Sequence, residues 1–259
     1  MSTQGLSGKT CLVTGGGGGL GKEISRQLLA KGANVVICDI NKDLLDSASK
    51  EFSGQGTLLT IQCDITSSES AEAMFEEIIQ KLGKLDVLVN NAGIMDRFDP
   101  AGDLEKDLWD KVIAVNLTAP YLLTRLAVRH FLERGATDAS ILNVGSLSSQ
   151  GGFFAGAAYT ASKHGLLGLS KNTAAFYRDK GIRCNLIIPS GMQTNIVTAF
   201  AQGTNQDGMA LAMTCGQAVK AAVVPLEDVA RLAVFLSSDE SSAISGSCVT
   251  LDKGFTSLF

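Results

Sequence analysis

The sequence predicts one α/β domain built on a doubly wound sheet of seven parallel strands, with helices covering both faces. Short apolar runs rich in β-branched residues alternate along the chain with longer stretches of helical periodicity, a pattern typical of βαβ units. A cluster of glycines at 15–19 follows the first apolar run and opens the first helical stretch. No Pro- or Ser-rich linker interrupts the 259 residues, so we expect a single domain over 1–259.

The expected elements follow from the order of these runs. The strands are expected at residues 10–14, 34–38, 57–62, 85–89, 140–144, 183–188 and 247–251. The helices are expected at about residues 20–31, 42–53, 67–82, 104–134, 157–180 and 226–237. Pro120 is expected to divide the fourth helical stretch, because proline is tolerated only in the first turn of a helix. Residues 190–224 break the alternation, and a connection of that length predicts a lid over the substrate.

Composition and charge argue against several classes of protein. The formal net charge is −4, which leaves no basic surface for nucleic acid or for an anionic membrane. No run of about 18 or more apolar residues could span a membrane, and the polar N-terminus has no signal-peptide pattern. The six cysteines stand singly, without the spacing of a metal site. We expect a cytoplasmic protein with reduced cysteines and no metal.

The glycine cluster has the context of a dinucleotide site. Glycines allow a tight turn and a close approach of the backbone to a pyrophosphate, which the free N–H groups of a helix start stabilise. The run of glycines leaves the register open, since positions 16, 18 and 21 fit G-x-G-x-x-G. Gly15, Gly19 and Gly21 fit T-G-x-x-x-G-x-G equally well.

Asp39 ends the second expected strand, 18 residues after Gly21. At an offset of roughly 20 residues, an acidic side chain meets the ribose of the adenosine. Its carboxylate would accept from the 2′-hydroxyl but repel a 2′-phosphate, and no Arg or Lys stands among the glycines. The sequence therefore predicts NAD rather than NADP. The alternative is that Asp39 only caps a turn or a helix.

Tyr159 and Lys163 are the predicted catalytic pair. A spacing of four residues at the start of a long helix places both side chains on one helical face. An adjacent ammonium stabilises a phenolate, so we expect Lys163 to lower the pKa of Tyr159 and to make it a workable general acid and base. Taken alone, Y-x-x-x-K also fits a packed tyrosine beside a solvated lysine.

Ser146 supports the catalytic interpretation because it lies 13 residues before Tyr159 and follows an expected strand. That position is the carboxyl edge of the sheet, where doubly wound folds bind their ligands. A hydroxyl there could donate to a substrate oxygen while Tyr159 moves the proton. Ser148 and Ser149 are nearby alternatives, and only the spacing favours Ser146.

Together these motifs resemble those of the short-chain dehydrogenase/reductase family over essentially the whole chain. The sequence also matches the family at Asn90-Asn91-Ala92-Gly93 and at Asn116. The resemblance implies a Rossmann fold and a homotetramer, with the helices around 104–134 and 157–180 at a subunit face. It implies four catalytic residues, namely Asn116, Ser146, Tyr159 and Lys163. It implies cofactor contacts from Gly15, Gly19, Leu20, Gly21, Asp39, Asp64, Ile65, Asn91, Ala92, Gly93, Tyr159, Lys163 and Thr194.

The resemblance also implies individual roles. Asp64 and Ile65 would lie near the adenine, and Asn90 would support the central strand and the cofactor. Asn116 would bind a water that relays protons to Lys163, which would also bond the hydroxyls of the nicotinamide ribose.

Two segments depart from the family pattern. Thr194 keeps its spacing from Pro189 and would contact the nicotinamide carboxamide, but Ser190 stands where the family usually has glycine. Asp252-Lys253-Gly254 replaces the more usual Asp-Gly-Gly. These departures put the local backbone path in question rather than the chemistry.

The expected reaction interconverts a secondary alcohol and a ketone, and an NAD preference favours oxidation. Ser146, Phe153, Phe154 and Tyr159 are the predicted substrate contacts. Residues 148–155 and 190–224 are apolar with few charges, which suits a bulky apolar alcohol such as a terpenoid, steroid or polyketide. The alternative is that these side chains only pack the lid or a subunit contact.

Three alternative functions can be compared with the motifs of this sequence. A ketoreductase using NAD(P)H would share every motif, because the same residues serve the reverse reaction. A non-catalytic Rossmann binding protein would lack Ser146, Tyr159 or Lys163, and none is missing. An epimerase or dehydratase on a nucleotide sugar commonly needs a larger C-terminal domain than this chain provides.

Overall fold

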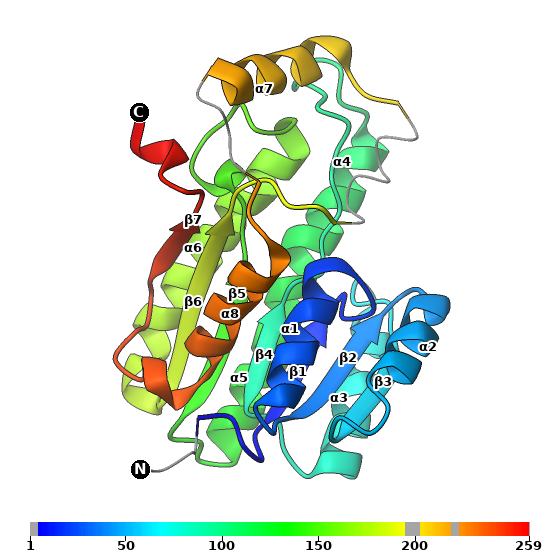
Figure 1. Cartoon of the computed structure of the whole chain (residues 1–259), viewed down its shortest axis with the longest axis vertical. Helices are drawn as coiled ribbons and strands as arrows, with labels where there is room; N and C mark the ends of the chain where they lie inside the picture. The colour runs from blue at the N-terminus through cyan, green and yellow to red at the C-terminus, as the bar shows by residue number, and fades with distance from the viewer. Residues whose placement is uncertain (1–4, 195–202, 219–222, 259) are drawn as a thin grey trace.

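The computed structural model describes residues 5–194, 203–218 and 223–258. Its centre is one sheet in the order β3-β2-β1-β4-β5-β6-β7 (Figure 1), and every pairing within it is parallel. The strands are β1 (Thr10–Thr14), β2 (Asn34–Asp39), β3 (Leu58–Gln62), β4 (Val87–Asn90), β5 (Ala139–Val144), β6 (Ile182–Pro189) and β7 (Cys248–Leu251). This topology confirms the predicted doubly wound sheet of seven parallel strands.

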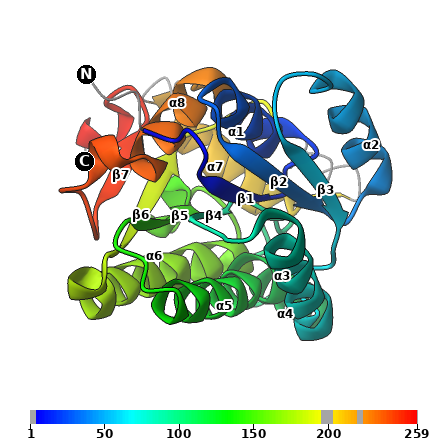
Figure 2. The ribbon, with the colours of Figure 1, turned by 90° about the horizontal axis from the view of Figure 1, so that it is seen from below.

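Helices cover both faces of the sheet, as the view in Figure 2 shows. One layer holds α1 (Gly19–Ala30), α2 (Lys42–Glu51) and α8 (Leu226–Ser237). The other layer holds α3 (Ser68–Leu82), α4 (Lys106–Ile113), α5 (Ala119–Glu133) and α6 (Ala157–Tyr177). Short helical turns are η1 (Ala114–Thr118), η2 (Leu147–Ser149), η3 (Arg178–Lys180), η5 (Asp239–Ser241) and η6 (Phe255–Leu258).

Two apolar cores lie between these layers because side chains of a strand alternate between its faces. In β2, Val35 and Ile37 pack in the cluster that includes residues of α1 and α8. Val36 and Cys38 pack in the opposite cluster with residues of α3 and α5. Within the described residues, no helix is long and apolar enough to cross a membrane.

Each expected strand is present, with ends displaced by at most two residues. The fourth helical stretch differs from the prediction, because it continues through Pro120 instead of ending there. α4 runs into a π-helical turn, η1, and then into α5. The π turn bonds the N–H of Ala119 to the carbonyl of Ala114, and Pro120 follows where its missing N–H is tolerated.

A helix also lies where the sequence predicted only an irregular lid. α7 (Gln206–Ala218) lies beyond the carboxyl ends of the strands (Figure 1). Asn205 accepts from Gly208 N at 3.0 Å and so caps this helix. Its own N–H donates to Arg97 O at 2.8 Å, which attaches α7 to the loop after β4.

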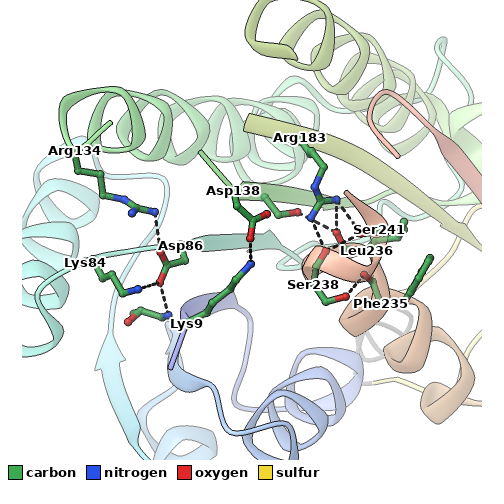
Figure 3. Close-up of polar contacts among 12 residues, drawn as sticks. Lys9, Lys84, Asp86, Arg134, Asp138, Arg183, Phe235, Leu236, Ser238 and Ser241 are labelled. Atoms are coloured by element: carbon green, nitrogen blue, oxygen red, sulfur yellow. Dashed lines mark hydrogen bonds and ion pairs between the residues drawn. The ribbon is translucent and has the colours of Figure 1, made fainter. Parts of the chain in front are cut away.

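The opposite, amino end of the sheet carries a network of paired charges (Figure 3). Asp86 accepts from Thr10 N and from Arg134, both at 2.8 Å, and from Lys84 at 3.0 Å. Lys9 pairs with Asp138 in the same region. These contacts join the starts of the strands to the end of α5. The charged side chains at this end of the sheet therefore hold the fold together.

Candidate active site

The turn between β1 and α1 has room for backbone but not for side chains. Gly15 and Gly19 have φ of 62° and 48°, in the left-handed region that favours glycine. A Cβ on Gly21 would lie 2.2 Å from the carbonyl oxygen of Gly15. These are the three positions of the T-G-x-x-x-G-x-G register. Gly18, the N-cap of α1, supplies no side-chain cap, so the first N–H groups of the helix stay available to an anion.

Thr14 and Asn91 hold this turn against the end of β4. The hydroxyl of Thr14 accepts from Asn91 N at 3.0 Å and from Ala92 N at 2.9 Å. The amide of Asn91 donates to Thr14 O at 2.8 Å. The sequence prediction did not name Thr14 as a site residue, although it begins the glycine motif. Asn91, which was predicted to contact the cofactor, supports the glycine turn through these bonds.

Asp39 lies beside the glycine turn. Its Oδ2 accepts from Gly17 N at 3.3 Å, and its Oδ1 accepts from Asn41 N at 3.0 Å. A Cβ on Gly17 would lie 3.1 Å from Asp39 Oδ2. The carboxylate thus stands at the edge of the turn that would hold the pyrophosphate. This geometry fits a nicotinamide dinucleotide, because the turn is a backbone cradle with an acidic group at its end.

The other predicted cofactor residues follow the carboxyl ends of their strands. Asp64 and Ile65 come directly after β3, where Asp64 Oδ1 accepts from Thr66 N at 2.9 Å. Gly93 follows β4, and a Cβ there would lie 3.6 Å from Lys163 Nζ. Thr194 follows β6 and is half-buried. The strand ends therefore bring these residues to one edge of the sheet.

Ser146, Tyr159 and Lys163 meet at the same edge. Ser146 caps η2 after β5, and a side-chain hydrogen bond links it to Tyr159. Lys163 Nζ lies 5.5 Å from the centre of the Tyr159 ring and donates to Val144 O at 2.8 Å. Tyr159 and Lys163 are 7% and 3% exposed. The alternative of a packed tyrosine beside a solvated lysine does not hold, since the lysine is buried.

Burial controls the protonation of this pair. Desolvation raises the pKa of Tyr159 to about 12, although the hydrogen bond from Ser146 opposes the shift. Desolvation also lowers the pKa of Lys163 to about 8. The expectation that Lys163 lowers the pKa of the tyrosine is therefore wrong for the protein alone. Both buried groups are held towards their neutral forms, because water is excluded from the site.

Asn116 sits in the π turn η1 and is fully buried. Its side chain bonds both Ile94 N and Ile94 O at 2.9 Å, and it donates to Ser162 Oγ at 3.2 Å. Ser162 in turn donates to Tyr159 O at 2.7 Å. The side chain of Asn116 thus joins the loop after β4 to the helix that carries Tyr159.

Asn90 has a bracing position at the end of β4. Its amide donates to Asn143 Oδ1 at 2.8 Å and to Thr124 Oγ1 at 3.3 Å, which ties β4 to β5 and to α5. Ser148 and Ser149 are both buried, and Ser149 Oγ accepts from Ser146 N at 3.2 Å. Ser149 thus helps to hold the turn that carries Ser146.

Phe153 and Phe154 lie between η2 and α6 with their ring centres 4.0 Å apart. Phe154 also packs against Phe255 from the C-terminal segment, with 5.8 Å between ring centres. Both predicted substrate contacts are half-buried, and Phe154 belongs to the edge of an apolar cluster. Within the predicted lid at 190–224, residues 195–202 and 219–222 lie outside the described residues, among them the apolar residues Ile196, Val197 and Phe200.

Comparisons with known proteins identify the family of this chain. A family profile described as enoyl-(acyl carrier protein) reductase matches residues 15–256. The chain is 45% identical to a short chain dehydrogenase/reductase of Colletotrichum higginsianum, over 99% of this chain and 97% of the relative. It is 38% identical to 3beta-hydroxysteroid dehydrogenase 2 of Eggerthella lenta, over 97% and 96% of the two chains.

A solved structure shares the whole fold. The crystal structure of levodione reductase superposes with a TM-score of 0.89 at 26% identity, covering 98% of this chain and 100% of that one. The family profile and the two relatives extend the agreement to the sequence, over almost the full length. The chain belongs to the short-chain dehydrogenase/reductase family of oxidoreductases.

Proposed function

We propose that this protein is an NAD(H)-dependent dehydrogenase that interconverts a secondary alcohol and a ketone, with Tyr159 as the proton-transferring group. The observation that carries the proposal is the buried cluster of Ser146, Tyr159 and Lys163 at the carboxyl edge of the sheet. A hydroxyl, a phenol and an ammonium within one dry site are suited to hold a substrate oxygen and to move its proton.

The nicotinamide ring would supply the hydride chemistry. Ser146 and Tyr159 would position the substrate oxygen, and the proton would move between that oxygen and the Tyr159 hydroxyl. With a pKa of about 12, Tyr159 carries its proton at neutral pH and is ready to donate it to a ketone. Oxidation needs the reverse transfer, so its rate should rise with pH, whereas the rate of reduction should not.

A proton path towards Lys163 has a structural basis near Asn116. Pro120 has no N–H, so it cannot donate to the main-chain carbonyl of Asn116 four residues earlier. The side chain of Asn116 is already committed to Ile94 and Ser162. We therefore assign the carbonyl, rather than the amide side chain, to the water that relays protons to Lys163.

The family binds a nicotinamide dinucleotide, and Asp39 supports NAD. Its carboxylate stands 3.3 Å from Gly17 N, where a 2′-phosphate would meet negative charge. The ribose 2′-hydroxyl of NAD would instead find an acceptor. Oxidation is the direction that an NAD preference favours.

A bulky apolar alcohol is the substrate class we propose. The 38% identical relative is named a 3beta-hydroxysteroid dehydrogenase, a name that describes a large apolar secondary alcohol as its substrate. Phe153 packs against Phe154 in the segment between η2 and α6, where it would offer an aromatic surface to such a molecule. A steroid, terpenoid or polyketide fits this description better than a sugar or a hydroxy acid.

We further propose a cytoplasmic homotetramer. α5 exposes Tyr121 and Leu132, at 49% and 43%, and α6 exposes Phe176 at 74%. Apolar side chains on these helices are consistent with a subunit face. Mass photometry should give four times the chain mass of 27.1 kDa, and a particle of the chain mass would contradict the tetramer.

The test of the proposed function is a titration with NAD, NADH, NADP and NADPH, followed by turnover with apolar secondary alcohols and ketones. Tyr159→Phe should bind the nucleotide as the parent chain does and lose turnover by about a hundredfold or more. Tighter binding of NADPH with ketone reduction alone would favour the ketoreductase alternative. Equal turnover by the variant would contradict the role of Tyr159.

A further inference from the structure

A carboxylate far from the catalytic residues in sequence is buried at the start of their helix. Asp96, in the loop after β4, is fully buried. Its Oδ1 accepts from Phe98 N at 3.1 Å and from Gly156 N at 3.0 Å. Its Oδ2 accepts from Tyr159 N at 2.9 Å. One side chain therefore holds three backbone N–H groups, two of which belong to the first turn of α6.

This contact replaces the cap that α6 lacks. Gly156 is the N-cap of α6 and has no side chain to accept from the first N–H groups. Asp96 accepts from the N-cap itself and from the third residue of the helix, which is Tyr159. The carbonyl of Asp99 accepts from Ala157 N at 3.0 Å, so the same loop holds a further N–H of this turn.

The loop adopts a costly conformation to make these contacts. Phe98 has a φ of 64°, in the left-handed region that bulky residues seldom adopt. Such a conformation is strained and persists only where surrounding contacts fix it. Here the bond from Phe98 N to Asp96 is one of those contacts. The strained residue and Tyr159 are thus bonded to the same carboxylate.

We propose that Asp96 is a positioning residue, which fixes the backbone of Tyr159 and whose negative charge acts on the phenol of the same residue. The proposal rests on the function proposed above, since it assigns the group that orients the proton donor. Asp96 would act through Tyr159 and not on the substrate.

The described groups around Tyr159 show what acts on it together with the charge of Asp96. Lys163 and the Ser146 hydroxyl face the tyrosine from α6 and from the start of η2. From α4 come the apolar side chains Leu108 and Val112, in the same cluster as Tyr159. Elsewhere in the loop, Arg97 and Asp99 pair with each other at 3.2 Å. The negative charge of Asp96 adds to the burial that raises the pKa of Tyr159.

Asp96→Asn is a sharp test because an amide has only one acceptor oxygen. Whichever way the amide turns, its NH₂ group must face either Tyr159 N or the pair formed by Phe98 N and Gly156 N. At least one buried N–H then loses its partner, and the charge is removed. Asp99→Asn is the matched control, since it removes a second buried carboxylate from the same loop. The described partner of that carboxylate is Arg97, and the bond from Ala157 N goes to the main-chain carbonyl, which the change keeps.

The first readout does not depend on activity. The chain has three tyrosines, so ¹⁵N-tyrosine labelling gives three amide signals, and Tyr159→Phe identifies the one at 159. In Asp96→Asn, the Tyr159 amide should exchange with solvent about tenfold faster or more, while Tyr121 and Tyr177 keep their rates. Unchanged protection of Tyr159 would overturn the proposal. This result stands whether or not a substrate has been found.

The second readout is kinetic. With any alcohol that the parent chain oxidises, Asp96→Asn should lower kcat about tenfold, with KM for the nucleotide within about threefold. The pH at which oxidation reaches half its maximum should move down, because the phenolate no longer faces a negative charge. A purely structural role would lower activity without moving that pH, and this outcome would also overturn the proposal.

A second variant covers the case in which Asp96→Asn does not fold. Asp96→Glu keeps the charge but moves its oxygens by one methylene, so kcat should fall while the pH midpoint stays in place. A parent-like kcat in Asp96→Glu would contradict the positioning role. A parent chain that turns over no alcohol or ketone would refute the proposed function instead, and the amide exchange would still decide the role of Asp96.

Discussion

The two ends of the sheet treat buried charge in opposite ways. At the amino end, Asp86 is 4% exposed and meets two cations and a backbone N–H. At the carboxyl end, Lys163 is 3% exposed and donates to a carbonyl, with no carboxylate paired to it among the described residues. Asp96 is fully buried there and bonds only backbone N–H groups among the contacts described.

Arg183 also serves the fold at the amino end, although its described partners are neutral oxygens rather than carboxylates. It donates to Leu236 O and Ser241 Oγ at 2.9 Å and to Ser238 O at 2.8 Å (Figure 3). These bonds join β6 to the end of α8. Charged side chains at the amino end therefore hold elements together, whereas Lys163 at the carboxyl end has no carboxylate paired to it among the described residues. Desolvation lowers the pKa of Lys163 to about 8, and a pKa moved towards neutrality suits a group that takes part in proton transfer.

The sharpest test of this contrast is Lys163→Met, which should lower turnover by about a hundredfold or more. The same change should stabilise the protein at pH 7 by about 1–2 kcal/mol, because a buried ammonium is no longer desolvated on folding. The pKa of Lys163 is lowered from 10.5 to about 8. The loss of folding stability caused by the buried ammonium is therefore complete below pH 8, and it disappears as the pH rises towards 10.5.

Urea unfolding at pH 7 and pH 10 measures this change, together with turnover. Lys171→Met is the matched control on the same helix, since exposed Lys171 also donates to a carbonyl, Gly246 O, at 2.7 Å. The control should keep its activity and show no gain in stability that depends on pH. A loss of stability in Lys163→Met at pH 7 would contradict the view that the buried ammonium of Lys163 destabilises the folded protein.

The amino end should respond in the opposite way. Asp86→Asn should destabilise the protein by about 2–3 kcal/mol, because it removes the charge that pairs with Arg134 and leaves either Thr10 N or Arg134 without an acceptor. Turnover by the folded variant should be unchanged. Asp138→Asn removes a half-exposed partner of Lys9 and should cost less than about 1 kcal/mol. Denaturant unfolding measures the stability of both variants, and steady-state kinetics measure their turnover. A loss of turnover in either folded variant would contradict the view that charges at the amino end serve only the fold.

Sequence reasoning recovered the strands well because their residues alternate between two apolar cores, as Val36 and Ile37 do. It placed Ser146, Tyr159 and Lys163 at one site because their spacing matches a family, and the structure brings these residues together. It missed α7, whose Gly208 and weak amphipathic pattern gave no helical period. Pro120 did signal an irregularity, but apolar periodicity does not distinguish a π turn from a helix end.

The role of Asp96 could not be read from the sequence, because its partners lie 60 and 63 residues away. An aspartate in a loop usually caps its own neighbourhood. The direction of the Tyr159 shift was also missed. Spacing shows that Lys163 is near, but the depth of burial, which dominates both pKa values, depends on packing across the whole site.

The cofactor preference gives a smaller expected effect. Asp39→Ser should change the ratio of NAD to NADP affinity by about tenfold in favour of NADP, because it removes a negative charge beside Gly17 N. Asp46→Ser is the matched control, since its exposed carboxylate pairs with Lys42 on α2. Fluorescence titration with both reduced nucleotides measures the ratio. An unchanged ratio in Asp39→Ser would limit that side chain to capping its turn.

The smallest effect is expected where the loop after β4 meets α7. A Cβ on Gly208 would lie 2.0 Å from Phe98 O, so Gly208→Ala must move α7 away from the strained loop. Alanine favours a helix over glycine by about 1 kcal/mol, so α7 itself should persist. We expect KM for the alcohol to rise about threefold to fivefold, with nucleotide affinity unchanged.

Leu211→Ala is the control for this last change, because Leu211 lies on the same helix and is 54% exposed. It should leave KM for the alcohol near the parent value. If Gly208→Ala also left KM unchanged, the contact between α7 and Phe98 would not belong to the substrate side of the site. The carboxyl end would then depend on Asp96 and the catalytic residues alone, and α7 would be a neighbour of the site rather than part of it.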